Sequence, residues 1–386
     1  LVPDLTAKAA RTAASNAGAK VVKTFAYEIS GSEQQEIYDI NPDLVLLCGG
    51  TDGGNKEVII ANAKHLVAID RPFTTIVAGN KSANDDIKAI FDEAGKDVVI
   101  TANVMPQFNK LNIEPARDAI RQLFISRIIE AKGLNILQSM TSYKIIPTPL
   151  AVLHACELLS KGTKTQQGRG DLLAVDIGGA TTDVYSMASG EPTVDNTMLK
   201  GLPEPWMKRT VEGDLGMRYS LTHVYEQIPG SDNPENEYMQ QVKAWVELCT
   251  ARPDTLAAPG SEEEKLEEFL GRSAVSMAVE RHCGRIADVF TPLGLMHTQE
   301  GKDLMNVPSV IGIGGVLRNS RRPEEILKGS LYDFMHPECT KPRKPKFYLD
   351  QKYIFASMGL LRSINPELAF ELLDKETVEI GCNATV

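Results

Sequence analysis

Two acidic residues flank a short, glycine-containing turn near the middle of the chain, Asp176-Ile-Gly-Gly-Ala-Thr-Thr-Asp183. Apolar segments lie on both sides of this turn, so residues 172–187 are predicted to form a strand, a tight turn and a second strand. Because glycine has no Cβ, the backbone at Gly178 and Gly179 can approach a phosphate closely and offer N–H donors. The pattern predicts a phosphate-binding turn, and an ordinary polar hairpin is the alternative.

The other side chains of the turn add donors and charge. Ala180 continues the backbone cradle, and the hydroxyls of Thr181 and Thr182 can donate hydrogen bonds to a phosphate. Asp176 and Asp183 are expected at the ends of adjacent strands, where two carboxylates can hold a hydrated Mg²⁺ or orient a water molecule. We therefore expect Asp176, Thr181 and Asp183 to be catalytic, with both aspartates as metal ligands.

A second glycine-rich turn follows the apolar segment 307–311 and precedes a predicted helix, with the sequence Gly312-Ile-Gly314-Gly315-Val-Leu-Arg318. Its glycines would let the backbone approach an adenosine, and the planar guanidinium of Arg318 could lie on the adenine ring. Such a glycine pattern alone is weak evidence. Together the two turns predict that the chain binds ATP with Mg²⁺ as cofactors.

The elements that must position these turns follow from the hydrophobic pattern. In the first part of the chain, apolar runs alternate with helical patterns, which is typical of a doubly wound α/β layer. The strands expected there are residues 21–29, 44–48, 74–80 and 97–101. Beyond the first turn, the pattern predicts helices over residues 204–227 and 262–288.

Composition and charge restrict the possible partners. The 386 residues contain 41 basic and 51 acidic side chains, a net charge of −10, which argues against binding to nucleic acid. No apolar run reaches the roughly 18 residues of a membrane span, and the first residues have no signal-peptide pattern. Six cysteines without a C-x-x-C pair favour reduced thiols. We expect a cytoplasmic protein that binds neither nucleic acid nor membranes.

Two further groups have a functional and a structural interpretation. The loop 48–55, rich in glycine, could bind an anion at a helix N-terminus, or could simply be a strand-to-helix turn. Glu212 and Asp214 could accept hydrogen bonds from a ribose, or could be an acidic cluster near a helix.

The order of the two glycine turns resembles the superfamily of ATPases that contains sugar kinases, Hsp70 and actin. Within it, several segments resemble the family of component L of glutamate mutase: residues 48–66, 104–124, 175–186 and 201–218. The resemblance implies a two-domain actin-like or Hsp70-like ATPase of ribonuclease H-like domains, with an inserted α/β subdomain. The implied domains are residues 1–165, residues 166–352 with both turns, and C-terminal helices 353–386 that return to the first domain.

The same resemblance implies a function. Members of this family are expected to act as ATP-dependent reactivating chaperones of adenosylcobalamin-dependent mutases such as glutamate mutase, so mutase subunits are the implied partners. A small-molecule kinase of the same fold is one alternative. A nucleotide-binding scaffold without catalytic activity is another.

The sequence departs from the superfamily pattern in three places. No first phosphate loop of the form D-x-G-S/T occurs before Asp176, so the N-terminal hairpin is expected to be missing from the chain. Ala180 replaces a glycine, and Thr148 stands where the chaperone branch has a glutamate. These departures predict slow ATP hydrolysis by an intact protein and impaired hydrolysis by the chain as it stands.

Overall fold

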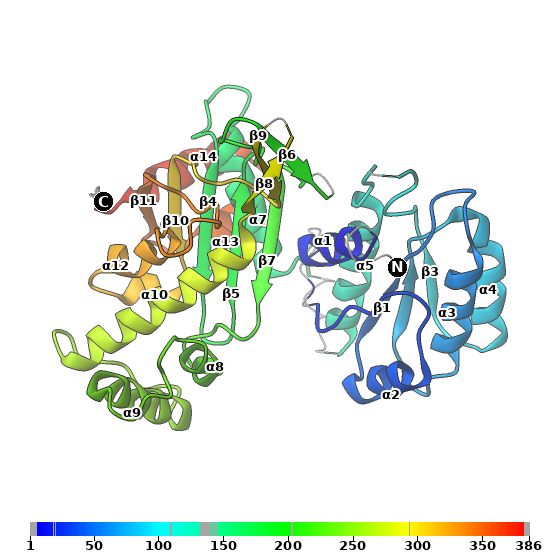
Figure 1. Ribbon diagram of the computed structural model, residues 1–386, viewed down its shortest axis with the longest axis horizontal. Coiled ribbons are helices and arrows are strands. Elements are labelled where there is room, and N and C mark those ends of the chain that lie inside the picture. Colours follow the sequence, from blue (N-terminus) through cyan, green and yellow to red (C-terminus); the bar gives the residue numbers. More distant parts are fainter. Residues whose placement is uncertain are drawn as a thin grey trace. The chain divides into compact units, whose positions relative to one another are not determined.

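The computed structural model describes residues 6–17, 19, 21–108, 110–131, 140–141, 145–201, 204–292 and 294–381. The chain forms two compact units (Figure 1). Unit 1 contains residues 1–147 and 201–203, and unit 2 contains residues 148–200 and 204–386. Among the described residues, no helix is long and apolar enough to cross a lipid bilayer.

Unit 1 is built on a parallel three-stranded sheet with the strand order β1-β2-β3. Its elements are α1 (Lys8–Asn16), α2 (Gly31–Ile40), β1 (Leu44–Leu47), α3 (Glu57–Val67), β2 (Thr74–Val77), α4 (Asn84–Glu93), β3 (Val98–Ile100) and α5 (Glu114–Ala131). Helices α3 and α4 cover one face of the sheet, and α1 and α5 lie together on the other (Figure 1). This arrangement confirms the predicted α/β layer.

The strand predicted over residues 21–29 is wrong, because this segment pairs with no strand among the described residues. The side chain of Asn62 bonds to backbone groups that a neighbouring strand would otherwise pair with. It accepts from the N–H of Ile29 at 2.8 Å and donates to the carbonyl of Tyr27 at 2.9 Å. Tyr27 also has φ 64°, outside the extended region. A cavity of about 520 Å³ separates the segment from β1.

Helix α2 was not predicted. A capping box begins it, in which Ser30 and Glu33 each satisfy a backbone N–H of the other residue. The sequence carries this signal, Ser-Gly-Ser-Glu, but its hydrophobic periodicity is weak.

Unit 2 is built on a mixed six-stranded sheet with the strand order β12-β11-β10-β4-β5-β7. Its elements are α7 (Thr148–Lys161), β4 (Leu172–Ile177), β5 (Thr182–Met187), β6 (Thr197–Lys200), β7 (Met207–Glu212), α8 (Leu221–Glu226), α9 (Glu237–Ala251), α10 (Glu262–His282), β8 (Arg285–Thr291), β9 (Gly294–Glu300), β10 (Ser309–Ile313), α11 (Gly315–Asn319), α12 (Pro323–Leu327), β11 (Lys346–Asp350), α13 (Phe355–Leu361), α14 (Pro366–Glu376) and β12 (Thr377–Glu379). Strands β4, β5 and β7 are antiparallel neighbours, whereas β10 runs parallel to β4 and to β11.

Two of the predicted helices are partly strand. Residues 207–212, predicted as helix, form β7 beside β5, and residues 285–288 begin β8, which pairs with β9. Around Arg209 the side chains alternate between the two faces of the sheet, and this charged side chain is buried because Asp183 of β5 neutralises it. A long-range ion pair of this kind is invisible to local periodicity.

Helices α7 and α13, which follow a proline and a polar loop, cross at very close range. Gly359 of α13 lies against the backbone of α7, because a Cβ placed on it would be only 1.8 Å from the carbonyl oxygen of Ala151. Both helices belong to unit 2. The domain limits expected from the sequence (1–165, 166–352 and 353–386) remain predictions.

Candidate functional site

The two predicted nucleotide turns meet at one edge of the six-stranded sheet. Strands β10 and β4 are direct neighbours, and Ile313 is paired with Asp176. Gly314 follows with φ 98°, and a Cβ on it would lie 2.5 Å from the carbonyl oxygen of Ile177 and 2.7 Å from Oδ1 of Asp176. The structure therefore brings the two turns into contact.

The first turn is a tight β-hairpin that is held from outside. The N–H of Gly178 donates to the carbonyl of Thr181 at 2.9 Å, which leaves Gly179 and Ala180 as the tip. The carbonyl of Gly179 accepts from the N–H groups of Arg218 and Tyr219, both at 2.8 Å. Within the described parts of the chain, the N–H groups of Gly179 and Ala180 have no acceptor, so they are available to an anion.

The glycines of the two turns have different roles. A Cβ on Gly314 would collide with backbone, so packing requires this glycine, whereas a Cβ on Gly312 would lie 2.9 Å from a methyl group of Leu317 and would displace that side chain. A Cβ on Gly179 would make only ordinary contacts, the nearest at 3.7 Å, and one on Gly315 would meet nothing closer than 3.8 Å. Packing therefore does not require a glycine at position 179 or 315, which is compatible with a role for these glycines in the approach of a ligand.

Asp176 provides the most available carboxylate at this edge. It is half-buried, and among the described residues it has no hydrogen-bond or ion-pair partner. Burial raises its pKa to about 7, the negative charges of Asp183 and Asp350 add to this, and Arg209 opposes it. A partner-less carboxylate fits Mg²⁺, which usually binds to one or two protein carboxylates and completes its shell with water and phosphate oxygens.

Asp183 is less available, because an arginine already holds it. Its Oδ1 accepts from Nε of Arg209 at 2.8 Å and from Nη2 at 2.5 Å, and both side chains are buried. Burial raises the pKa of Asp183 and Arg209 lowers it. Its second oxygen lies 3.4 Å from the hydroxyl of Thr181. Asp183 thus faces the same edge as Asp176, but only one of its oxygens could contact a metal-bound water.

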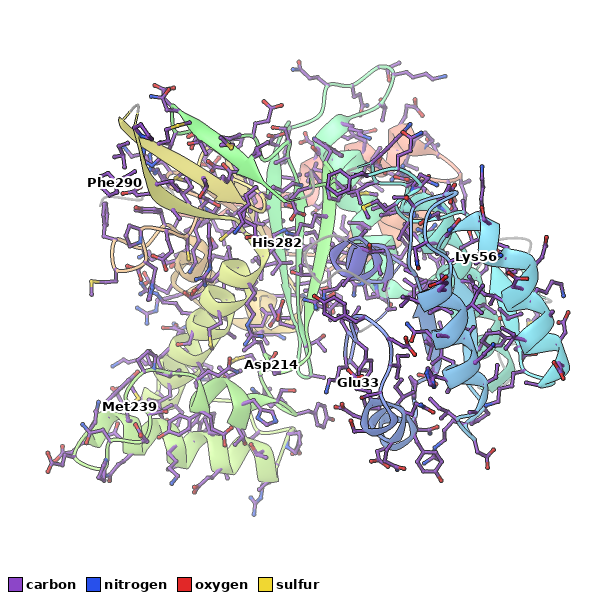
Figure 2. The ribbon with its side chains drawn as sticks, turned by 45° about the vertical axis from the view of Figure 1, so that its right-hand side comes forward. Glu33, Lys56, Asp214, Met239, His282 and Phe290 are labelled. Carbon is purple, nitrogen blue, oxygen red and sulfur yellow. The ribbon has the colours of Figure 1, made fainter. Side chains whose placement is uncertain are left out.

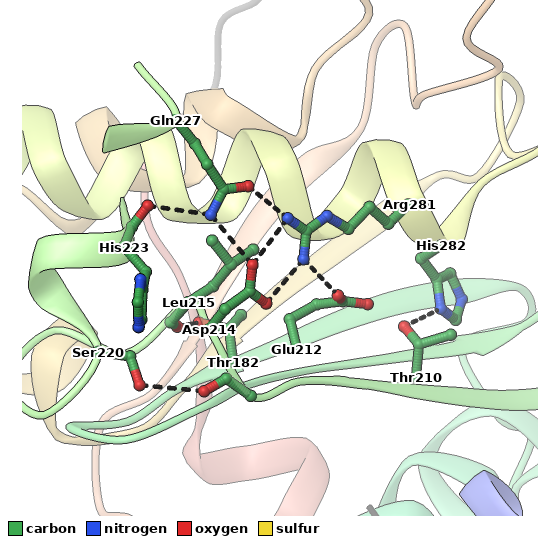
Figure 3. A network of polar contacts seen from close by, with 11 residues as sticks. Thr182, Thr210, Glu212, Asp214, Leu215, Ser220, His223, Gln227, Arg281 and His282 are labelled. Atoms are coloured by element: carbon green, nitrogen blue, oxygen red, sulfur yellow. Dashed lines mark hydrogen bonds and ion pairs between the residues drawn. The ribbon is translucent and has the colours of Figure 1, made fainter. Parts of the chain in front are cut away.

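Thr182 lies behind the turn. It is fully buried, and its hydroxyl donates to the carbonyl of Leu215 (Figure 3). The structure thus gives Thr182 a role in joining β5 to the loop after β7. Its predicted contact with phosphate remains a prediction.

A third carboxylate near this edge, Asp350, was not predicted from the sequence. It ends β11, it is buried, and it accepts from the N–H groups of Ile354 at 2.9 Å and Phe355 at 3.0 Å. Burial raises its pKa, and these backbone hydrogen bonds and the charge of Arg318 oppose the rise. Arg318 itself is exposed on α11. The sequence signal that could have identified Asp350 is its position between the apolar run 347–349 and a helical pattern.

The acidic pair at the end of β7 is neutralised by one arginine (Figure 3). Arg281 donates to Glu212 at 2.7 Å and to both carboxylate oxygens of Asp214 at 2.8 and 2.9 Å. Gln227 also donates to Asp214 at 3.0 Å. The hydrogen bonds of Arg281 lower the pKa of Asp214 to about 2. These contacts favour the structural interpretation of the cluster, and Arg281, at the end of α10, was not predicted.

Hydrogen bonds within unit 1 also explain the conformation of the glycine-rich loop 48–55. Gly50 and Gly53 have positive φ, and the side chain of Asn80 accepts from the N–H of Gly53 and donates to the carbonyls of Gly54 and Asn55. This favours a strand-to-helix turn.

Comparison with known proteins identifies the family. Residues 1–377 match the family model described as MutL protein. Protein MutL of Clostridium tetanomorphum is 46% identical over 383 residues, which cover 98% of this chain and 82% of that protein. These matches extend over both units and include both turns of the site. The chain therefore belongs to the MutL family, the glutamate mutase component L family that its sequence resembles.

Proposed function

We propose that unit 2 binds ATP with Mg²⁺ at the edge where the two turns meet. The observation that carries this proposal is the contact between Asp176 and Gly314, which joins a hairpin with free N–H donors to a second turn suited to adenosine. Gly178, Gly179, Ala180 and Thr181 would surround the phosphates. Gly315 and Arg318 would contact the adenosine, and Asp176 would hold Mg²⁺, which neutralises phosphate charge when bound.

The sheet topology supports an actin-like ATPase unit. Three antiparallel strands, β7, β5 and β4, are followed by the parallel strands β10 and β11. A ribonuclease H-like domain of the expected type has this order. The hairpin between β4 and β5, the first two strands of this sheet in chain order, is the position to which the sequence resemblance assigns the phosphates.

We further propose that the protein uses ATP to reactivate an adenosylcobalamin-dependent mutase, with glutamate mutase as the first candidate. Membership of the MutL family supports an association with glutamate mutase in general. Radical enzymes lose their cofactor in side reactions, and a nucleotide-dependent change of shape could open such an enzyme for exchange of the damaged cofactor.

A second candidate, a nucleotide-binding partner that does not hydrolyse ATP, is favoured by two observations. Asp183 is tied to Arg209, and Thr148 lacks the carboxylate expected at the start of α7. In this case ATP would change the interaction with the mutase by binding alone.

Reactivation of an inactivated mutase tests the proposal. Glutamate mutase that has lost activity is incubated with the protein, Mg²⁺, free adenosylcobalamin and either ATP or a non-hydrolysable ATP analogue. We expect recovered activity with ATP and none with Asp176→Asn. Recovery with the analogue as well would assign the function to binding alone, whereas no recovery under any condition would contradict the chaperone role.

A further inference from the structure

Two cysteines that are distant in the sequence lie together where α10 ends and β8 begins. Cys283 is the residue after α10, and the segment around Cys339 runs antiparallel beside it, with Arg285 and Cys339 forming a β-bridge. The N–H of Ile286 donates to the carbonyl of Glu338 at 2.8 Å, and the N–H of Thr340 donates to that of Gly284 at 3.0 Å. Backbone hydrogen bonds on both sides therefore fix the two cysteines next to each other.

The two thiols are neighbours, and each influences the pKa of the other. Both cysteines are free: the Cys283 thiol donates to the carbonyl of Glu280 at 3.5 Å, and the Cys339 thiol lies 3.9 Å from a carboxylate oxygen of Glu338. Cys283 is 8% exposed and Cys339 only 1%, so an external reagent would reach Cys283 first. Since residues i and j−2 of an antiparallel ladder lie on the same face, both side chains point to one side of the sheet.

The surroundings of Cys283 are cationic. Lys341 is buried on the same face and donates to the hydroxyl of Ser276 at 2.9 Å. The neighbouring Cys339 thiol lowers the pKa of Cys283, and the charges of Lys341 and Lys208 lower it further against the effect of burial. The Cys283 thiol and burial raise the pKa of Cys339. Cys283 is therefore both the more acidic and the more exposed thiol of the pair, so it is the one that reacts first.

The other cysteines that the structure describes have different environments. Burial raises the pKa of Cys48 to about 12 and that of Cys249 to about 11, and it also raises that of Cys156. Among the described residues, no second thiol influences the pKa of any of these three cysteines. Thiolate character decides which cysteine reacts with an oxidant, so Cys283 is singled out.

We propose that Cys283 and Cys339 form a reversible disulfide, which makes this pair a redox modification site of the protein. The Cys283 thiolate attacks one sulfur of a low-molecular-weight disulfide such as oxidised glutathione, and the first small thiolate leaves. Cys339 then loses its proton to water and attacks the sulfur of Cys283, which releases the second small thiol. Two protein thiols are oxidised, and one small disulfide is reduced to two thiols.

The disulfide would act on the region that joins α10 to the six-stranded sheet. His282, labelled in Figure 2, precedes Cys283, and its buried ring bonds to Ser186 of β5 at 2.8 Å and Thr210 of β7 at 2.9 Å. Oxidation would close a covalent loop that contains β8, β9 and β10. It should therefore raise the midpoint of thermal unfolding, as cross-links between distant residues usually do.

The experiment treats the full-length chain, without denaturant, with oxidised glutathione, blocks remaining thiols with N-ethylmaleimide and maps peptides by mass spectrometry. We expect a Cys283–Cys339 cross-linked peptide that disappears with dithiothreitol. Cys249→Ser, a buried cysteine without a thiol neighbour, is the matched control and should form the same cross-link. Cys339→Ser should stop at a glutathione adduct on Cys283.

Two results would overturn the proposal. One is the absence of the cross-linked peptide in wild-type protein whose circular dichroism spectrum is native. The other is a cross-link that appears only after urea is added, because it would then belong to the unfolded chain. Cys283→Ala, with its fold checked by the same spectrum, should remain unmodified at Cys339, and efficient glutathione addition there would contradict the order of attack.

Discussion

At the scale of single residues, variants of Gly179 and Gly314 distinguish a glycine needed for ligand approach from a glycine needed for packing. Gly179→Ala adds a methyl group that the folded protein accommodates, since its nearest neighbour is Cβ of Arg218 at 3.7 Å. We expect the free energy of unfolding to stay within about 0.5 kcal/mol of wild type and ATP affinity to fall about tenfold or more. Urea denaturation and a binding titration measure the two quantities.

Gly314→Ala is the matched packing variant. Its Cβ would meet the carbonyl oxygen of Ile177 at 2.5 Å, in a backbone with positive φ. We expect it to lose about 1–3 kcal/mol of stability. If Gly179→Ala were the more destabilised of the two, packing rather than ligand approach would explain the glycine at position 179.

Asp176 should give the protein a characteristic dependence of stability on pH. Its folded-state pKa of about 7 lies above its ordinary value of 3.8, so the folded state favours the protonated form. This contribution is fully present below the ordinary pKa and is lost as the pH rises toward 7. Without Mg²⁺ and nucleotide, Asp176→Asn should be more stable than wild type at pH 8, by on the order of 1 kcal/mol or more.

Urea denaturation of both proteins at pH 4.5 and pH 8 checks this prediction, with the pH values chosen on either side of the titration. The difference between wild type and Asp176→Asn should grow with pH. A difference that is constant across this range would show that the folded protein does not raise the pKa of Asp176.

At the scale of elements, the crossing of α7 and α13 depends on one glycine. A Cβ on Gly359 would lie 1.8 Å from the carbonyl of Ala151, so Gly359→Ala must push the two helices apart. We expect a loss of about 1–3 kcal/mol, or more if the helices cannot separate. Gly31→Ala, at the start of α2 with nothing within 4 Å of the added Cβ, is the control and should be nearly neutral.

The elements also show what the sequence could predict. The hairpin 172–187 and the turn at Gly312 were predictable because their glycines and strands are adjacent in the chain. Strand β7 was not predictable, because the burial of Arg209 depends on Asp183, which belongs to a different strand, β5. The same holds for the Arg281 cluster: its partners Glu212 and Asp214 come together only after α10 packs on the sheet. Local patterns identify turns, whereas ion pairs between elements need the fold.

At the scale of the whole molecule, each unit has hydrophobic clusters of its own. Among the described residues, one cluster lies within unit 2 and three lie within unit 1. Both tryptophans, Trp206 and Trp245, lie in unit 2. We therefore expect tryptophan fluorescence to report the unfolding of unit 2 only, while far-ultraviolet circular dichroism reports both units.

In urea, the fluorescence and circular dichroism transitions should differ, and Gly359→Ala should shift the fluorescence curve to lower urea. Coincident curves in wild type and variant would instead show that the chain unfolds as one cooperative unit.

The central claim, that the meeting point of the two turns binds ATP with Mg²⁺, is tested most directly by calorimetric titration of the full chain. The account predicts saturable binding at one site per chain in the presence of Mg²⁺. It also predicts an affinity about tenfold or more weaker in Asp176→Asn, whose fold is retained. Absence of binding to wild type, or equal affinity in the two proteins, would contradict it.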